Sequence, residues 1–308
     1  MNLEVVKHFI TERENIRKKR EAGEPPPWTD NPIIRDYRFC NVRREGDRTS
    51  RWVAKNWREP LSDYPDGWFA SAVAAYVNLP ETMAEIGLPL PYDRERIRGV
   101  LLSRQQRGLP MFGAAYKIKG IDYVDSTLNR LHRARDVLRP TTGLSLQAFS
   151  DRLLQFEGVG TFMSGQIIAG AKYAGVLRSA PDWMTFAVSG PGSRRGLARV
   201  MGRPADYSWS NEASWRTAFH RFEGAMRPWL LEAGLGDLHC QDLSCAKRIS
   251  SGERSPAKES LSGASWPPCR PVAWRQNSNI GAKARVVEAA GKRCSSARSA
   301  RCLVDRLP

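Results

Sequence analysis

The sequence predicts a mainly α-helical protein with a disordered basic C-terminal tail. Apolar residues recur at helical spacing along most of residues 1–246, whereas few stretches alternate with the period of two that marks a strand. Hydrophobic residues make up 41% of the 308-residue chain, which is enough for a substantial core. From about Arg248 onward Ser, Arg, Ala, Pro and Gly dominate and the periodicity fades. We therefore expect a helical domain over residues 1–246 and a basic low-complexity tail over residues 247–308.

The first half of the expected domain contains several helical stretches. Residues 3–20 place charged side chains between apolar ones in an amphipathic pattern, and the prolines at 25–27 end this helix. Residues 68–78 are apolar at helical spacing, and Pro80 is a favourable start for the next helix. The amphipathic pattern then returns over residues 92–107.

Two further amphipathic stretches follow in the second half. Residues 121–138 predict a helix that buries Leu128, Leu131 and Val137. Residues 215–231 carry large apolar side chains at helical spacing and predict another helix. With no internal repeat, these elements indicate a single helical architecture.

The charge of the chain points to an acidic polymer as its partner. The formal net charge is +16. Residues 247–308 hold 13 Lys and Arg against four Asp and Glu, so much of the excess lies in the tail. Because a basic tail is also often a merely solvating segment, DNA binding by the body of the protein must be argued from motifs.

Other classes of protein find little support. The cluster of His239, Cys240 and Cys245 is short of the four ligands that a zinc site needs, so no metal is expected, and no cofactor is expected either. The N-terminus lacks a signal-peptide pattern, and no apolar run reaches membrane-spanning length. We expect a soluble protein of the cytoplasm, with reduced thiols and no membrane contact.

The segment around Gly158 predicts a DNA-binding turn between two helices. One helix runs from the 140–143 turn to Gly158, and the next covers residues 161–174. Gly158 and Gly160 permit the positive φ angles of a tight turn. The N–H groups at the start of the second helix, at Thr161, can then bind a DNA phosphate. An ordinary corner between two helices is the alternative interpretation.

Two further features follow this turn at close spacing. Asp182 and Trp183 come about twenty residues later, and residues 190–197 form a loop rich in Gly and Arg. Asp182 follows Pro181, so it is also a candidate helix cap. This order places a candidate phosphate-binding turn, a carboxylate and a candidate anion-binding loop within one short stretch.

Several blocks together resemble a known family. They are residues 35–48, 112–116, the Gly158 hairpin, 182–186 and 190–197. The pattern is similar to the helix-hairpin-helix DNA glycosylase-like superfamily, and within it to the helical domain found beside 5-hydroxymethyluracil DNA kinases in phage thymidine hypermodification. As a free-standing protein it resembles the phage amino acid:DNA transferases, the α-glutamyl/putrescinyl-thymine pyrophosphorylases. The resemblance covers about residues 1–246 and departs from the family after residues 241–243.

The resemblance implies an enzyme that acts on double-stranded phage DNA in the bacterial host cytoplasm, as a step that protects the genome from host restriction. Its substrate would be phosphorylated 5-hydroxymethyl-deoxyuridine, flipped out of the duplex. A free amino acid, with glycine as the first guess and glutamate and serine as alternatives, would displace phosphate through its amine. A 5-hydroxymethyluracil DNA kinase would be the functional partner.

The expected site residues fall into three groups. Asp182, Arg194 and Arg195 are the predicted catalytic residues, with Asp182 matching the family's catalytic Asp in position. Gly158, Gly160 and Thr161 are the predicted DNA-binding residues. Predicted substrate-binding residues supply cations, hydrogen-bonding groups or aromatic rings to stack on the base; they are Arg43, Arg44, Asp47, Arg48, Tyr116, Lys117, Trp183 and Ser193, with Phe39 a further stacking candidate.

Two other functions remain open at this stage. One is a true DNA glycosylase in which Asp182 assists hydrolysis; a lyase is disfavoured because the second hairpin helix has no Lys before Lys172. The other is a non-catalytic DNA-binding module that partners a kinase. A Gly-x-x-x-x-Gly-Lys-Ser/Thr motif is absent, so the chain itself is not expected to be the kinase.

Overall fold

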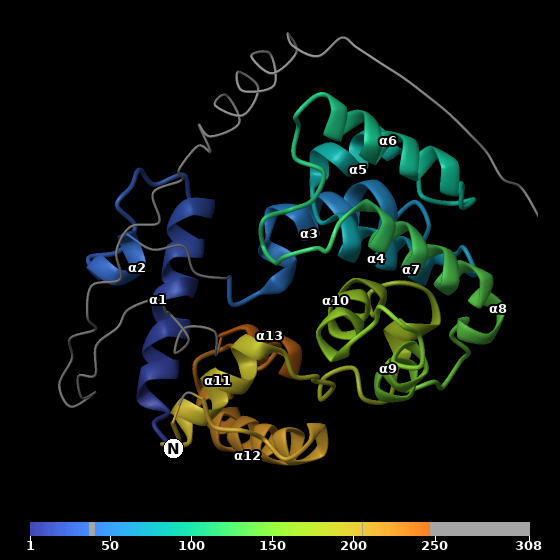
Figure 1. Ribbon diagram of the computed structural model, residues 1–308. Helices are drawn as coiled ribbons and strands as arrows, with labels where there is room; N and C mark the ends of the chain where they lie inside the picture. Colours follow the sequence, from blue (N-terminus) through green and yellow to red (C-terminus); the bar gives the residue numbers. More distant parts are fainter. Residues whose placement is uncertain (37–40, 205, 247–308) are drawn as a thin grey trace, which may run out of the picture. The chain divides into compact units, whose positions relative to one another are not determined.

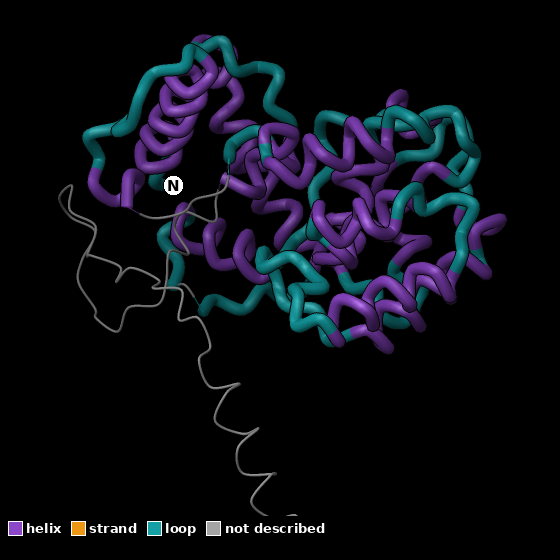
Figure 2. The backbone as a smooth tube through the Cα atoms, turned by 90° about the horizontal axis from the view of Figure 1, so that it is seen from above, coloured by secondary structure: helices purple, strands orange, loops and turns teal. Residues whose placement is uncertain are grey.

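A computed structural model describes residues 1–36, 41–204 and 206–246 of the chain. Within these ranges the secondary structure is helical and no strand is present (Figure 2). The mainly α prediction is therefore confirmed. The predicted tail at 247–308 and the candidate Phe39 lie outside the described residues, so the division into domain and tail stays a prediction.

Figure 1 shows the arrangement of the helices. In chain order they are α1 (Glu4–Glu21), α2 (Pro32–Asp36), η1 (Arg44–Gly46), α3 (Arg48–Val53), the π-helical turn η2 (Ala54–Arg58), α4 (Gly67–Val77), α5 (Pro80–Ile86), α6 (Arg94–Gln106), α7 (Ile121–Arg133), α8 (Arg135–Leu138), α9 (Leu146–Leu153), α10 (Thr161–Ala171), η3 (Gly175–Ser179), α11 (Pro191–Val200), α12 (Glu212–Glu232) and α13 (Cys240–Ala246).

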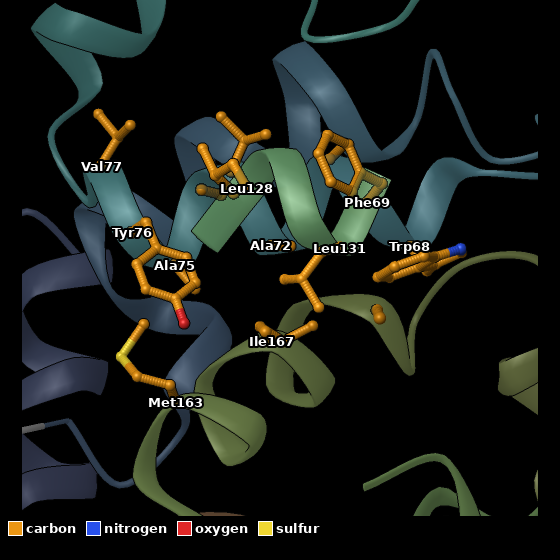
Figure 3. Close-up of a cluster of buried hydrophobic side chains, with 14 of the residues drawn as sticks. Trp68, Phe69, Ala72, Ala75, Tyr76, Val77, Leu128, Leu131, Met163 and Ile167 are labelled. Carbon is orange, nitrogen blue, oxygen red and sulfur yellow. The ribbon is translucent and has the colours of Figure 1, made fainter. Parts of the chain in front are cut away.

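The larger apolar cluster is built around α4, which is buried along its whole length from Trp68 to Val77. Helix α10 packs along α4, and Ile167 and Met163 meet the α4 side chains there (Figure 3). Leu128 and Leu131 of α7 close the cluster from another side. A helix that is apolar all round has to be covered on every face, and this explains why α4 lies in the middle of its neighbours.

A second apolar cluster joins the two ends of the described chain. Val6 and Phe9 of α1 pack with Leu197 of α11 and Trp215 of α12. The Asn2 N–H also donates to the Val200 carbonyl at 2.7 Å. The N-terminal helix and the last helices therefore share one core, and they bring residues 42–46 near α13.

Two details differ from the sequence prediction. Val137, expected to be buried, is 75% exposed, because the helix breaks after Arg133 and restarts as α8 in a different rotational phase. Asp182, expected at the start of a helix, lies in the turn that follows η3, and the next helix begins only at Pro191. In the part of the chain that the structure describes, no helix is long and apolar enough to span a bilayer.

Candidate functional site

The turn between α9 and α10 is stabilised by two hydrogen bonds from neighbouring helices to one of its backbone carbonyls. Gly158 has φ +95°, and its carbonyl oxygen accepts the hydroxyls of Tyr76 at 2.8 Å and Tyr123 at 2.7 Å. A Cβ on Gly158 would run into the side chain of Thr127, which is fully buried on α7. Only glycine fits this position, for reasons of both φ and space.

The N-terminus of α10 is open. Gly160 is the N-cap residue in extended conformation with φ −93°, so the positive φ expected in this turn is found at Gly158 and not at Gly160. Within the described residues no side chain caps the helix. Gly160 is exposed, and nothing lies within 4 Å of a Cβ built on it. The N–H groups of a first turn have no intrahelical acceptor, and the helix dipole adds positive potential there. Gly158, Gly160 and Thr161 therefore present a geometry that suits a phosphate.

Asp182 is engaged with the start of α9. Its Oδ1 accepts the Leu146 N–H at 2.7 Å and its Oδ2 accepts the Gln147 N–H at 2.9 Å. Ser145 completes this cap by accepting the Ala148 N–H at 3.0 Å. Both carboxylate oxygens thus stabilise the hairpin. The predicted catalytic role of Asp182 is not tested by this geometry, which gives the residue a structural task of its own.

The Gly/Arg-rich loop begins α11, and its two arginines differ. Arg194 donates to Ser189 Oγ at 2.7 Å and forms an ion pair with Glu212 at 3.0 Å. Arg195, the next residue of the helix, is exposed. Ser193 is buried and accepts the Gly190 N–H at 2.8 Å, so it shapes the first turn of α11.

The three arginines between residues 43 and 48 also have different partners. Arg43 pairs with Glu14 and Asp237, and Arg48 is an exposed residue that pairs with Glu81. Of these three arginines Arg44 contacts α10, where its guanidinium donates to Gln166 Oε1 at 2.8 Å.

Asp47 also lies away from the catalytic segments. Its Oδ1 accepts the side-chain amide of Asn41 at 2.6 Å. Burial raises the pKa of Asp47 above its usual range, and Arg44 acts in the opposite direction. Asp47 therefore fixes the 41–47 loop, and any contact with substrate stays a prediction.

Two polar pockets share Arg44 and Gln166 as a common wall. One, which we call the α11 pocket, is also bordered by the first turn of α11 and by α13. Its polar lining consists of Arg44, Gln166, Ser189, Ser193, Gln241 and Ser244. The other, which we call the α4 pocket, lies against α4 and η2. Its polar lining includes Arg44, Glu45, Arg58, Asn78, Tyr116 and Gln166.

Each pocket is small. The α11 pocket holds about 30 Å³ and the α4 pocket about 40 Å³. On this measure one water molecule needs about 10–15 Å³, so each pocket has room for a small polar ligand of a few non-hydrogen atoms and not for a whole nucleotide. Arg44 stands between two spaces that each suit such a ligand or substituent.

A buried network anchors the backbone of Arg44. Asp242 Oδ1 accepts the Arg44 N–H at 3.1 Å, and Asp242 Oδ2 lies 3.1 Å from His239 Nε2. The Tyr173 hydroxyl is 2.9 Å from the same His239 nitrogen. Because His239 Nδ1 accepts the Asp242 N–H at 3.2 Å, the proton of the neutral ring is on Nε2.

Burial shifts the protonation of this network. It raises the pKa of Asp242 to about 6 and lowers the pKa of His239 to about 3, with Lys172 and Arg44 adding to the latter shift. It also lowers the pKa of Lys172 to about 8. The Lys172 ammonium lies 4.0 Å from the Trp183 ring centre and donates to the Trp183 carbonyl at 3.4 Å. Such shifts gather at functional sites and also in structural networks.

Trp183 and Arg58 close this network. The Trp183 indole donates to the Lys172 carbonyl at 2.9 Å, and its ring packs edge-on against Tyr173. The Arg58 guanidinium lies over the Tyr173 ring, 4.8 Å from its centre, and Arg58 also pairs with Glu45. Trp183 therefore supports the buried cluster, and its predicted stacking on a base stays untested.

The remaining predicted binders come from the 112–118 segment. Tyr116 lines the α4 pocket, donates its hydroxyl to the Ala75 carbonyl and packs edge-on against Phe162 at 5.1 Å. Lys117 is exposed beside it. The structure thus brings together Arg44, Ser193 and Tyr116, and places Arg43, Asp47, Arg48 and Arg195 elsewhere.

Sequence reasoning missed the partners of Arg44. Gln166 and Gln241 are single glutamines with no local motif, and Lys172 was noted only as a residue beyond the hairpin. His239 was weighed as a metal ligand, yet within the described ranges no group of three or more His, Cys, Asp or Glu is placed to hold a metal ion. Polar residues inside strongly apolar stretches were the available signal, as Gln166 and Lys172 illustrate.

Comparison with known proteins decides the family. A family model described as the helical domain of 5-hmdU DNA kinase matches residues 2–226. The chain belongs to this family. Among curated proteins, the 5-hmdU DNA kinase of Bacillus phage SP10 is 26% identical over 224 residues, covering 62% of this chain and 35% of the relative. The chain thus corresponds to about a third of that relative's length, and no solved structure matches it.

The family match covers most of the candidate site. Arg44, Gln166, Lys172 and Ser193 all lie within residues 2–226. Gln241 and the other residues of α13 lie beyond it. One wall of the α11 pocket is therefore contributed by a segment outside the matched region.

Proposed function

We propose that this chain transfers an amino acid, through its amine, onto phosphorylated 5-hydroxymethyl-deoxyuridine in phage DNA and displaces phosphate. The family match and the named phage relative support a place in thymidine hypermodification. The observation that carries the transfer step is the pair of pockets that share Arg44 and Gln166. A transferase has to hold two substrates against one another, whereas a simple hydrolase needs a pocket for one.

The proposed reaction balances without a further reactant. The bond between the exocyclic carbon and the phosphate oxygen breaks, and its electron pair leaves with the phosphate. The amine nitrogen forms the new bond to that carbon. One ammonium proton ends on the released phosphate, which leaves as hydrogen phosphate, and the product nitrogen is a secondary ammonium.

Arg44 is the residue that can serve both partners. Its guanidinium is a permanent cation with several donors, so it can stabilise the charge that develops on the leaving phosphate. Its backbone is fixed by Asp242 and its side chain by Gln166. A cation held in advance costs no reorganisation in the transition state, and this is where electrostatic catalysis gains most.

The α4 pocket suits the phosphomethyl group of the DNA substrate. Arg44 and Arg58 both border it, and Asn78 and Tyr116 supply neutral polar groups. At about 40 Å³ it admits the substituent while the pyrimidine ring stays at the mouth. The base would leave the helical stack to reach it, at a cost of a few kcal/mol, and the open end of α10 would hold the neighbouring phosphates.

The glycosylase alternative finds less support in the geometry. Its catalytic candidate, Asp182, directs both carboxylate oxygens to backbone N–H groups of α9. These contacts take up one acceptor site on each oxygen and commit the carboxylate to a structural role at the start of α9.

Mass spectrometry of nucleosides tests the proposal. The full chain is incubated with duplex DNA that contains phosphorylated 5-hydroxymethyluracil, together with a mixture of free amino acids, and the DNA is digested to nucleosides. A new nucleoside that carries the mass of an amino acid supports the proposal and names the substrate. Free base with abasic sites would show a glycosylase, and unchanged DNA would leave a binding module that partners a kinase.

A further inference from the structure

In the described part of the chain, the α11 pocket is lined by a cation without a carboxylate, whereas the α4 pocket is lined by both. Among the described residues that line it, Arg44 is the one that is charged. The nearby carboxylate of Glu212 is neutralised by Arg194 and also accepts the Ser189 N–H and hydroxyl. The described side chains that line the pocket therefore carry a formal charge of one cation.

The start of α11 adds donors to this pocket. Gly190 and Ser193 border it, and Pro191 at the first helical position has no N–H. The next N–H groups of the first turn have no intrahelical acceptor. Arg44 and the α11 dipole thus favour an anion at one side of the pocket.

An unpaired acceptor on the opposite element points to a second charge on the ligand. Gln241 of α13 is 6% exposed and lines the pocket. Its Nε2 donates to the Gly165 carbonyl at 2.8 Å, which fixes the amide orientation, and its Oε1 is buried with no hydrogen-bond partner among the residues that the structure describes. A buried acceptor left unpaired costs free energy, so it favours a ligand that brings a donor.

We propose that the α11 pocket binds a free α-amino acid as its zwitterion, with the carboxylate on Arg44 and the N-terminus of α11 and the ammonium on Gln241 Oε1. This assignment rests on the proposed function and names which pocket holds which substrate. Phe162 and Val188 close the pocket, and a Cβ on Gly165 would run into Val188. The walls and the volume of about 30 Å³ select glycine or another small amino acid.

Direct binding to the full chain, without DNA, tests the assignment. Isothermal titration calorimetry with glycine, acetate and methylamine separates the zwitterion from its two halves. Glycine is expected to bind at least tenfold more tightly than either acetate or methylamine. Equal affinity for glycine and acetate would reduce the pocket to an anion site and overturn the proposal.

Variants of the two proposed contacts are expected to change the affinities for glycine and acetate in different patterns. Arg44→Gln is expected to weaken both glycine and acetate by tenfold or more, whereas Gln241→Leu weakens glycine about tenfold and leaves acetate unchanged. Arg51→Gln and Gln105→Leu are matched controls, because both residues are exposed and neither lines the pocket. Glycine binding that survives both pocket variants would overturn the assignment.

A third variant is expected to gain affinity for one ligand, which misfolding could not cause. Gln241→Glu places a carboxylate beside the proposed ammonium, so methylamine should bind several-fold more tightly than to the unaltered chain. A gain in affinity cannot come from unfolding. An unchanged methylamine affinity in a variant that melts normally would contradict the ammonium contact.

The two proposals fail in different ways. Glycine binding that depends on Arg44 and Gln241, without any new nucleoside in the DNA assay, would leave the pocket assignment and remove the transferase. A new nucleoside without amino acid binding at up to about 10 mM, above the usual range of substrate affinities, would leave the transferase and overturn the pocket assignment.

Discussion

The two ends of α10 are both polar, and they are built from different groups. At the N-terminal end the polar groups are backbone N–H groups of an uncapped turn beside the exposed Gly160. Farther along the helix they are the side chains of Gln166, which accepts the Arg44 guanidinium, and of buried Lys172, which contacts Trp183.

This difference separates two tasks. Backbone groups at an open helix end can hold any phosphate, whatever the base attached to it. Buried side chains with shifted pKa values are fixed in position and excluded from water, and these are the conditions in which charge stabilisation is strongest. We therefore expect variants at the N-terminal end to alter DNA affinity or hairpin stability, and variants at the other end to alter protonation and chemistry.

The largest expected effect comes from Gly158. Gly158→Ala combines a positive φ with a collision against buried Thr127, and should lower the free energy of unfolding by roughly 3 kcal/mol. Gly160→Ala is the control, since its φ is −93° and the space around it is open. Urea denaturation of both variants measures the difference, and equal stabilities would contradict the account of the turn.

The next effect is a pH dependence at the other end of α10. Between about pH 8 and pH 9.5 the unfolded Lys172, with its ordinary pKa near 10.5, keeps its proton while the folded one loses it. The unfolded state then binds more protons, so stability rises with pH, by about 1–2 kcal/mol over this window. Lys172→Met should remove this rise.

Other groups restrict the window for that measurement. Above pH 10 the raised pKa values of Tyr76 and Tyr173 act in the opposite direction, since the folded state then keeps protons that the unfolded state loses. Denaturation curves at several pH values up to 9.5 avoid this region. The same slope in the unaltered chain and in Lys172→Met would show that Lys172 is not the group that titrates.

A smaller effect tests the task of Asp182. Asp182→Ala removes two acceptors from the start of α9 and should cost roughly 1 kcal/mol of stability, because Ser145 still caps the helix. If capping is the whole role, transfer activity measured well below the melting temperature should be nearly unchanged. Activity lost in a variant of unchanged stability would instead support the predicted catalytic role.

The smallest effect concerns DNA contact at the open end of α10. Thr161→Glu puts a negative charge where a phosphate is expected, and should weaken DNA binding about threefold at low salt and less at high salt. Thr161→Gln is the uncharged control. Fluorescence anisotropy with duplex DNA measures both, and identical affinities for the two variants would place the DNA elsewhere.

Local features of the fold could be predicted from the sequence. The apolar residues at helical spacing in 68–78 correspond to α4, and Pro80 begins α5. Gly158 has the positive φ that was expected in its turn. These depend on residues close together in the chain. Val137 was predicted wrongly because the break after Arg133 is marked by neither Gly nor Pro.

The assembled site could be predicted only in part. Arg44, Ser193 and Tyr116 were candidates, but nothing in their local sequence distinguishes inward-facing Arg44 from outward-facing Arg48. That distinction depends on Asp242, which lies far along the chain and accepts the Arg44 N–H. Contacts of this kind follow from tertiary packing and leave no periodic signal.

The central claim is that Arg44 serves the two substrates of one transfer reaction. The most direct test is nucleoside mass spectrometry of phosphorylated 5-hydroxymethyluracil DNA incubated with glycine and either Arg44→Gln or Arg51→Gln. Our account predicts that the glycine-bearing nucleoside forms with Arg51→Gln and falls at least a hundredfold with Arg44→Gln, about 2.7 kcal/mol in transition-state stabilisation. Equal yields from the two variants would contradict it.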